Sequence, residues 1–252
     1  MLVWIILVIF GAALLAGAGV FGLERLVPAK RRASHNDVFG FVYAVVGVAY
    51  AVLLGLVVIA AWNTLDQTRT NTYGETDALV QLYWYGHSLP QPQGTEVEHL
   101  VTEYITVVIN VEWPELAHQQ SSVQAWRVSI QLRDLVQAQQ PAAPAAVARY
   151  QQALDSAAQL SDARRERIDL ADEGIPSMLW AGLILGGIVT VGFAYFFGMK
   201  STLAHAIVMF SITLIFACLL LVVYELNYPF SGIVKVNPDA FKLALELIQQ
   251  IP

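Results

Sequence analysis

Residues 38–62 read VFGFVYAVVGVAYAVLLGLVVIAAW and contain no charged side chain. A helix needs about 20 predominantly apolar residues to cross the roughly 30 Å hydrocarbon core of a bilayer, and this stretch exceeds that length. Three other runs of comparable apolar character occur in the chain, at Leu2–Leu23, Met178–Phe197 and Ala206–Tyr224. The sequence therefore predicts an integral membrane protein with four transmembrane helices.

The composition of the whole chain agrees with this prediction. Mean hydropathy is +0.54. Hydrophobic residues make up 56% of the chain and charged residues 13%, whereas soluble domains carry about 25% charged residues. The apolar runs form two pairs around a polar middle. The predicted fold is therefore an all-α membrane protein, with four transmembrane helices in two pairs and an inserted helical soluble domain.

This pattern divides the chain into four parts. Residues 1–62 hold transmembrane helices at about 2–23 and 38–62, and residues 63–175 form an acidic helical soluble domain. Residues 176–226 hold transmembrane helices at about 176–197 and 205–226. Residues 227–252 form an interfacial turn and an amphipathic C-terminal helix. No proline occurs from Asn63 to Gln81, so we expect the second transmembrane helix to continue beyond Trp62.

Basic residues in the short loops predict the orientation. The first loop contains four of them, at Arg25, Lys30, Arg31 and Arg32. Lys200 lies in the short loop between the last two apolar runs. Short loops rich in Lys and Arg stay in the cytoplasm, whereas long loops cross the membrane largely regardless of charge. The arginines of residues 164–167 lie in a long loop, so they do not decide the orientation. We therefore expect a multi-pass protein of the cell membrane, with both termini and the soluble domain extracytoplasmic.

The soluble stretch is acidic. From Asp66 to Glu173 it contains 15 Asp and Glu residues and 7 Arg residues, which gives a net charge of −8. Nucleic acid binding requires a basic surface, so nucleic acid is excluded as a partner. Two interpretations of the acidity remain open: an ordinary solvated surface, or a vestibule that attracts cations and repels anions.

No arrangement of residues in this stretch indicates catalysis or metal binding. His87, His99 and His118 are scattered, and the H-E-x-x-H, G-x-S-x-G, P-loop and C-x-x-C patterns do not occur. Glu96 and Glu103 share a predicted helix face with His99, but three such residues on an exposed face are more often solvated than ligating. We therefore expect no enzyme activity, no cofactor and no metal ion.

Local signals predict several helices in the soluble domain. A capping box formed by Thr95 and Glu98 is expected to begin one helix, and Trp113-Pro114 to end it. Ser121-Ser122 is expected to open the next helix. The residues expected on the buried side of that second helix are Val123, Trp126, Ile130 and Val136.

The second apolar run carries small residues at helical spacing, which lets helix backbones approach closely in lipid. The positions predicted to line a pore or to pack against another helix are Tyr43, Gly47, Tyr50, Ala51 and Gly55. Two interpretations remain open: packing of four helices within one subunit, or packing of this helix against copies of itself around an axis. No charge or proline lies inside any of the four runs, which argues against ion-coupled transport but is compatible with a channel.

Short motifs occur in a defined order along nearly the whole chain: Asn36-Asp37-Val38-Phe39-Gly40, Glu112-Trp113-Pro114, Arg167, Pro176-Ser177-Met178-Leu179-Trp180 and Pro229-Phe230-Ser231-Gly232. Together they resemble the bacterial family of four-span membrane proteins with a bestrophin-like domain. The motif positions that carry the resemblance best are Asn36, Trp113, Pro114, Pro176, Trp180, Pro229, Phe230 and Gly232. The family pattern tends to have Asp where this chain has Asn227.

The resemblance implies a relation to bestrophins, which are pentameric anion channels with four spans per subunit and a hydrophobic neck lined by the second span. On that relation, the helix at 38–62 lies at the pore. Bestrophins keep the large domain and the termini in the cytosol, whereas the loop charges of this chain predict the reverse. The acidic soluble domain would also repel anions if it formed the vestibule of the channel.

Two functions follow from these observations. The first is a homo-oligomeric ion channel with the second span at its axis, whose partners are the lipid bilayer, further copies of the chain and ions. The second is a non-conducting membrane scaffold or envelope sensor whose helical domain binds a protein partner.

Overall fold

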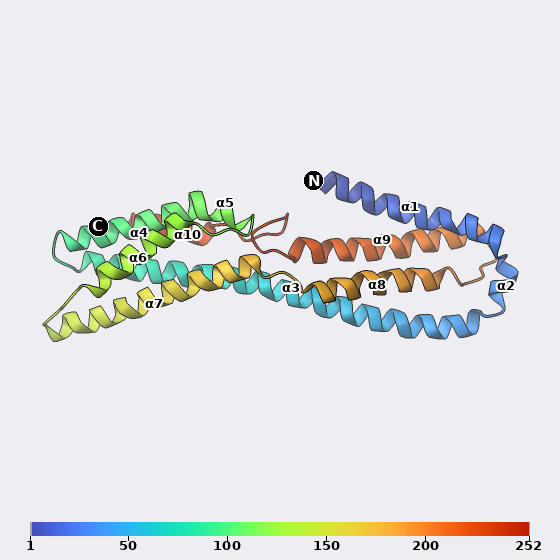
Figure 1. Ribbon diagram of the computed structural model, residues 1–252, viewed down its shortest axis with the longest axis horizontal. Coiled ribbons are helices and arrows are strands. Elements are labelled where there is room, and N and C mark those ends of the chain that lie inside the picture. Colours follow the sequence, from blue (N-terminus) through green and yellow to red (C-terminus); the bar gives the residue numbers. More distant parts are fainter. Residues whose placement is uncertain (1, 252) are drawn as a thin grey trace. The chain divides into compact units, whose positions relative to one another are not determined.

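The computed structural model describes residues 2–251, and every regular element in that range is a helix (Figure 1). The apolar helices are α1 (Leu2–Leu26), the first half of α3 (Asn36–His87), α8 (Ser177–Ala194) and α9 (Thr202–Leu226). The other helices are α2 (Ala29–Ala33), α4 (Gln93–Val107), α5 (Trp113–Leu116), α6 (Val123–Gln137), α7 (Pro144–Asp172) and α10 (Asp239–Ile248), with the π-helix η1 (Val108–Glu112) between α4 and α5. Four helical segments are long and apolar enough to cross a membrane, judged by length and composition. The predicted all-α fold class is confirmed.

The helix α3 is a single 52-residue helix that begins apolar and ends polar. With a rise of about 1.5 Å per residue, it is more than twice as long as the roughly 30 Å hydrocarbon core of a bilayer. No proline interrupts it. The predicted continuation of this helix beyond Trp62 is therefore confirmed.

The chain divides into two compact units, each with its own buried side chains. The first, here called the apolar unit, consists of Met1–Ala61 and Ile175–Asn227. The second, here called the polar unit, consists of Trp62–Gly174 and Tyr228–Pro252.

In the apolar unit, α1 lies along α9 (Figure 1). A Cβ atom added to Gly17 of α1 would lie only 3.1 Å from the carbonyl oxygen of Ala206 in α9. The Tyr195 hydroxyl also donates to the carbonyl oxygen of Ala16 at 2.7 Å. Small residues thus bring these backbones close together, which is the usual basis of helix association in lipid.

The first loop is fastened to the segment that joins α8 and α9. Arg32 is buried, and its Nη1 atom donates to the carbonyl oxygens of Tyr195 and Phe197, each at 2.9 Å. Its Nη2 atom forms an ion pair with Glu24. Arg32 therefore links the first loop to the segment between α8 and α9, and it is not an ordinary solvated charge of a loop.

Asn36 and Gly198 form a second link between the same segments. The Asn36 side chain donates to the Gly198 carbonyl oxygen at 3.1 Å and accepts from the Gly198 N–H at 2.9 Å. A Cβ atom on Gly198 would lie 2.3 Å from the backbone nitrogen of Ala33 and 2.4 Å from the carbonyl oxygen of Ala29. This approach requires glycine at position 198.

Replacing Gly198 by alanine is expected to destabilise the apolar unit, because the added methyl group collides with backbone atoms that have no rotamer to change. Overpacking of this kind costs about 1–3 kcal/mol. Thermal unfolding in detergent should give a lower Tm for Gly198→Ala. The matched control is Gly192→Ala, since nothing lies within 4 Å of a Cβ atom there. An equal loss of Tm in both variants would show that the contact at Gly198 is not tight.

The core of the polar unit is formed by α4, α6, α7, α10 and the second half of α3. Its large, fully buried apolar and aromatic side chains are Leu79, Leu82, Tyr104, Ile105, Leu116, Leu132, Phe241 and Ile248. Burying one aliphatic side chain of this size stabilises a fold by about 1.5–3 kcal/mol. The polar unit therefore has the core of a folded helical domain.

Both predicted ends of α4 are wrong. The helix begins at Gln93, where the Gln91 side chain accepts a hydrogen bond from the Thr95 N–H at 3.3 Å. Thr95 therefore receives a cap instead of supplying one. Helical structure also continues past Trp113, because Pro114 lies in the first turn of α5, where its missing N–H is not needed.

The N-terminus of α6 is confirmed, but its buried face differs from the predicted one. The Ser122 hydroxyl accepts from the Ala125 N–H at 3.4 Å and caps the helix. The residues buried on α6 are Ala125, Val128, Ser129, Leu132 and Val136. Three of the predicted core residues are exposed: Val123 (63%), Trp126 (49%) and Ile130 (37%). The prediction was wrong because two faces of α6 carry apolar residues at helical spacing, and spacing alone does not select the face that meets the core.

Candidate functional site

One face of the apolar half of α3 packs within its own subunit. Tyr50, Leu54 and Val57 are only 4%, 5% and 4% exposed. Their spacing of four and three residues places them on one side of the helix. They form a core with Leu183 of α8 and Val223 of α9. This face of α3 is therefore already occupied.

The two tyrosines of the predicted pore set belong to this inner side. The α8 helix accommodates the Tyr50 ring because Gly186 and Gly187 lack side chains. A Cβ atom on Gly186 would lie 2.6 Å from Cδ2 of Tyr50, and one on Gly187 would lie 3.1 Å from its hydroxyl oxygen. Tyr43 packs edge-on against Phe197, with ring centroids 5.5 Å apart. Both rings therefore contact residues of their own subunit.

The opposite face of α3 is exposed. Six large apolar side chains recur there every three or four residues, and each is 56–74% exposed: Phe41, Val45, Val48, Val52, Leu56 and Ile59. These six residues are called the outer stripe below. An apolar helix face of this kind is satisfied by lipid or by a second copy of the chain.

The small residues of the predicted set lie on the flank of α3 between its buried inner face and the outer stripe. Nothing lies within 4 Å of a Cβ atom added to Gly47 or Gly55. Ala51, between them, is exposed. The predicted set therefore falls into two groups: the tyrosines pack inside the subunit, and the small residues leave open space for an approaching helix.

The motif residues of the apolar unit lie where helices and connecting segments meet. Asn36 is the first residue of α3 and forms the link to Gly198 described above. Pro176 immediately precedes α8, and Trp180 packs partly buried against the core of α3, α8 and α9. The Asn227 side-chain oxygen accepts from the Ile175 N–H at 2.8 Å, and an aspartate oxygen accepts the same type of bond. These residues hold the unit together.

A buried ion cluster lies in the polar unit. Arg167 of α7 is fully buried, and it donates from Nε and Nη2 to the two carboxylate oxygens of Glu75, at 2.7 Å and 3.1 Å. Its Nη2 atom also lies 3.3 Å from Glu112, which pairs with Arg164 at 3.1 Å. These four residues are called the ion cluster below, and their formal charges cancel.

A hydroxyl and aromatic rings enclose the ion cluster. The Tyr104 hydroxyl donates to Glu75 at 2.6 Å. The Arg167 guanidinium lies over the rings of Trp113 and Phe241, at 5.6 Å and 5.5 Å from their centroids. Such an apolar enclosure excludes water and strengthens the attraction between the charges.

The enclosure shifts two pKa values. Burial by itself lowers the pKa of the Arg167 guanidinium, but the negative charges of Glu75 and Glu112 outweigh this effect and hold it above its ordinary value. Burial raises the pKa of Tyr104 well above its ordinary value, and the negative charge of Glu75 adds to the shift. Arg167 therefore stays charged and Tyr104 stays protonated at neutral pH, so both continue to donate to Glu75.

The motif residues of the polar unit converge on the same place. The Trp113 indole N–H donates to the Val236 carbonyl oxygen at 3.3 Å, and its ring packs edge-on against Phe230 at 5.2 Å. Gly232 adopts a φ of 79°, which glycine takes without strain. The Pro229 carbonyl oxygen accepts from the Val236 N–H at 2.8 Å. The segment 229–236 therefore folds over Trp113, which in turn covers the ion cluster.

The ion cluster is a structural centre. Glu75, Glu112 and Arg167 have no exposed side-chain surface, so a substrate cannot reach them. No group of three or more His, Cys, Asp or Glu side chains in the described residues is arranged to hold a metal ion. The cluster joins α3, α7 and the π-helix η1. Sequence reasoning singled out Glu112 and Arg167 only as motif residues and missed their pairing.

Comparison with known proteins gives a family and a fold. Residues 10–241 match the family model of the bestrophin-like domain. The fold is similar to the crystal structure of a bacterial bestrophin homologue from Klebsiella pneumoniae, with a TM-score of 0.70 and 12% identity, over 98% of this chain and 100% of that chain. A mutant of a bestrophin homologue from the same organism gives a TM-score of 0.69 and 13% identity, over 96% of this chain and 99% of that chain. A crystal structure described as that of a membrane protein gives a TM-score of 0.67 and 14% identity, over 95% of this chain and 96% of that chain. No curated protein matches the chain.

Proposed function

The chain belongs to the bestrophin-like family, and we propose that it forms a homo-oligomeric ion channel of the cell membrane with the apolar half of α3 around its axis. The observation that carries the proposal is the exposed outer stripe of α3, together with the open space at Gly47 and Gly55 on the flank of the same helix. The inner face of the same helix is filled by α8 and α9. A second copy of the chain therefore meets α3 on its outer side.

An axis lined by α3 is hydrophobic. No charged residue occurs between Val38 and Trp62. A hydrophobic constriction conducts when it is wetted and closes when it dewets, so it requires no buried charge. Gly47, Ala51 and Gly55 allow neighbouring α3 helices to approach closely around such a constriction.

The charge of the polar unit supports a preference for cations. Because the ion cluster is neutral, the net charge of −8 between Asp66 and Glu173 resides on the other residues of that stretch. A negative entrance concentrates cations and repels anions. We therefore expect potassium and sodium to permeate more readily than chloride.

Reconstitution tests this function. Purified protein is expected to have a native mass of several copies and to pass current in a planar bilayer. Under a KCl gradient, the reversal potential is expected to shift toward the equilibrium potential of potassium. Protein-free bilayers and the heat-inactivated protein are the controls. A monomer in bilayers that stay electrically tight would end the proposal.

A second function is favoured by the exposed apolar face of α6. Val123, Trp126 and Ile130 form this face and lie outside the core of the polar unit. A non-conducting scaffold or envelope sensor would use such a surface to bind a protein partner. This alternative predicts a defined protein that co-purifies with the wild type and is lost in Ile130→Ser, together with the absence of ion flux.

The orientation and the placement of the parts are also proposals. We propose that the polar unit lies outside the bilayer on the extracytoplasmic side, as the loop charges predict. In a Cys218→Ser background, Asp162→Cys in spheroplasts should react with an impermeant maleimide, and Lys30→Cys should react only after lysis. Both positions are exposed. The reverse labelling pattern would place the polar unit in the cytoplasm.

A further inference from the structure

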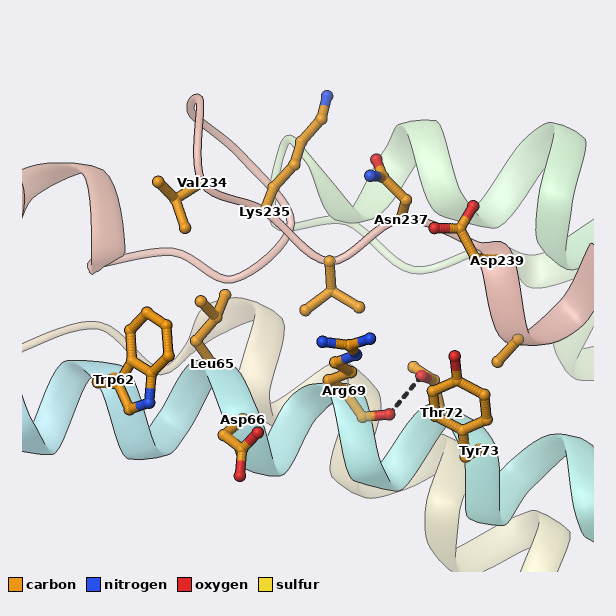
Figure 2. Close-up of a pocket in the computed structure, with 12 residues that line it drawn as sticks. Trp62, Leu65, Asp66, Arg69, Thr72, Tyr73, Val234, Lys235, Asn237 and Asp239 are labelled. Atoms are coloured by element: carbon orange, nitrogen blue, oxygen red, sulfur yellow. Dashed lines mark hydrogen bonds between the residues drawn. The ribbon is translucent and has the colours of Figure 1, made fainter.

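The polar unit contains a pocket with a cavity volume of ≈370 Å³ (Figure 2). It lies between the start of the polar half of α3 and the segment that leads into α10. Its lining residues are Trp62, Leu65, Asp66, Arg69, Thr72, Tyr73, Val234, Lys235, Val236, Asn237, Asp239 and Ala240. None of them belongs to the ion cluster, so the pocket is a separate feature.

Along α3 the pocket is lined first by Trp62 and Leu65 and then by polar residues, which are Asp66, Arg69, Thr72 and Tyr73 (Figure 2). Trp62 and Val234 lie at one end and are 57% and 42% exposed. Arg69 lies in the middle, and Tyr73 and Asp239 lie at the other end. An amphiphile with an apolar part, an anionic part and a polar cationic tip matches this order.

The basic side chains of the pocket are available to a ligand. Neither the Arg69 guanidinium nor the Lys235 ammonium forms an ion pair or hydrogen bond with another of residues 2–251. Asp239 forms only an exposed contact with Lys242, at 3.7 Å. With Asp66, the pocket has two basic and two acidic side chains, so it has no net charge although both signs are present.

The apolar end of the pocket includes Trp62, the residue at which the apolar run 38–62 ends. Trp62 directly follows the last apolar residues of the span within the same continuous helix, and tryptophan is enriched at the membrane interface. Arg69 lies about 10 Å further along the helix axis. The headgroup layer extends about 5–7 Å beyond the hydrocarbon on each side. An arginine side chain is long enough to span the remaining distance between its own backbone and this layer.

We propose that this pocket binds the headgroup of phosphatidylethanolamine, a zwitterionic phospholipid with a primary ammonium group. Arg69 and Lys235 hold the phosphate, because a guanidinium binds a phosphate with paired hydrogen bonds. Asp239 and the face of Tyr73 hold the ammonium. The site is independent of whether the chain conducts ions.

The chemistry of the pocket selects against the other common headgroups. Phosphatidylglycerol offers a phosphate but no cation for Asp239. The quaternary ammonium of phosphatidylcholine has no N–H to donate to a carboxylate, and quaternary ammonium groups are held by aromatic cages. The primary ammonium of ethanolamine donates three hydrogen bonds and suits a carboxylate.

Native mass spectrometry of the full-length protein with defined lipids tests the site. The wild type is expected to bind phosphatidylethanolamine at least about fivefold more tightly than phosphatidylglycerol or phosphatidylcholine. Arg69→Gln should weaken phosphatidylethanolamine and phosphatidylglycerol alike by about tenfold, a loss typical of one charged hydrogen-bonded contact. Asp239→Asn should remove the preference for phosphatidylethanolamine without weakening phosphatidylglycerol. Both side chains are exposed, so both variants should keep the wild-type Tm.

The matched control is Arg127→Gln, which removes an exposed arginine of α6 outside the pocket. Lipid binding should be unchanged in this variant. Equal affinity of the wild type for all three lipids, or equal losses in Arg127→Gln and Arg69→Gln, would overturn the proposal. Displacement of the bound lipid by millimolar inorganic phosphate would also overturn it, because the pocket would then be a site for free phosphate.

Discussion

Replacing Arg167 by methionine is expected to lower the free energy of unfolding of the polar unit by about 3–5 kcal/mol, the loss typical of breaking a buried ion pair. The substitution leaves two fully buried carboxylates, Glu75 and Glu112, with Arg164 as the one remaining cation of the ion cluster. An uncompensated carboxylate in an apolar core costs far more than the lost packing of one side chain. Denaturant titration in detergent, followed by limited proteolysis of the polar unit, measures the loss.

Two further variants show whether charge balance is the cause. Arg165→Met removes the neighbouring arginine of α7, whose side chain and that of its partner Asp162 are each 69% exposed. This control should stay within about 0.5 kcal/mol of the wild type. The double variant Arg167→Met with Glu75→Gln restores neutrality and should be more stable than the sum of the single variants. Strict additivity, or a loss in Arg165→Met equal to that in Arg167→Met, would disprove the role of the ion cluster.

Replacing Gly47, Ala51 and Gly55 by leucine is expected to alter the channel more than the fold of the subunit. Nothing lies within 4 Å of a Cβ atom added to Gly47 or Gly55 in the single chain, so the first atom of each added side chain fits at these two positions. Between neighbouring copies they fill the space that lets α3 helices approach. We expect the current per protein to change by about tenfold or more, because a constriction is sensitive to small changes in radius. Bilayer recording and native mass measurement report the two effects separately.

The control for the leucine variant is Ala181→Leu, at an exposed position of α8 outside the proposed axis. It should leave both current and oligomer size unchanged. An unchanged current and an unchanged mass in the leucine variant would place the small residues against lipid. Changed assembly in a protein that never conducts would favour the scaffold instead.

The membrane-spanning architecture could be predicted from the sequence because its cause is local. Uninterrupted apolar runs such as 38–62 have one stable solution in lipid, the helix, in which all backbone groups are paired. The absence of proline after Trp62 likewise predicted the continuous α3 helix. These features depend on neighbouring residues alone.

The ion cluster could not be predicted because its cause is not local. Glu75 and Arg167 are 92 residues apart and pair through the fold. A signal existed in the sequence. Glu75 takes its place in the buried series Thr68, Thr72, Glu75, Leu79 and Leu82 on α3, and both arginines continue the buried series Ala153, Ala157, Leu160, Arg164 and Arg167 on α7. A charge at a core position of a helix indicates a partner, but the sequence alone does not name that partner.

The small residues of α3 illustrate a different limit. Their spacing predicted close helix packing without a partner helix, because small residues serve contacts within and between chains equally well. In the structure, Tyr50 packs against Gly186 and Gly187 of its own subunit. The flank of Gly47 and Gly55 is open. Tyr50 therefore fits packing within one chain, and contact of the small residues with another copy stays a prediction.

Recording from the purified protein in a planar bilayer, with its native mass determined on the same sample, tests the channel most directly. We expect a complex of several copies that produces unitary currents carried mainly by cations, and currents that the leucine substitutions at Gly47, Ala51 and Gly55 change. Silent bilayers containing a correctly folded single copy would contradict the proposed role of α3.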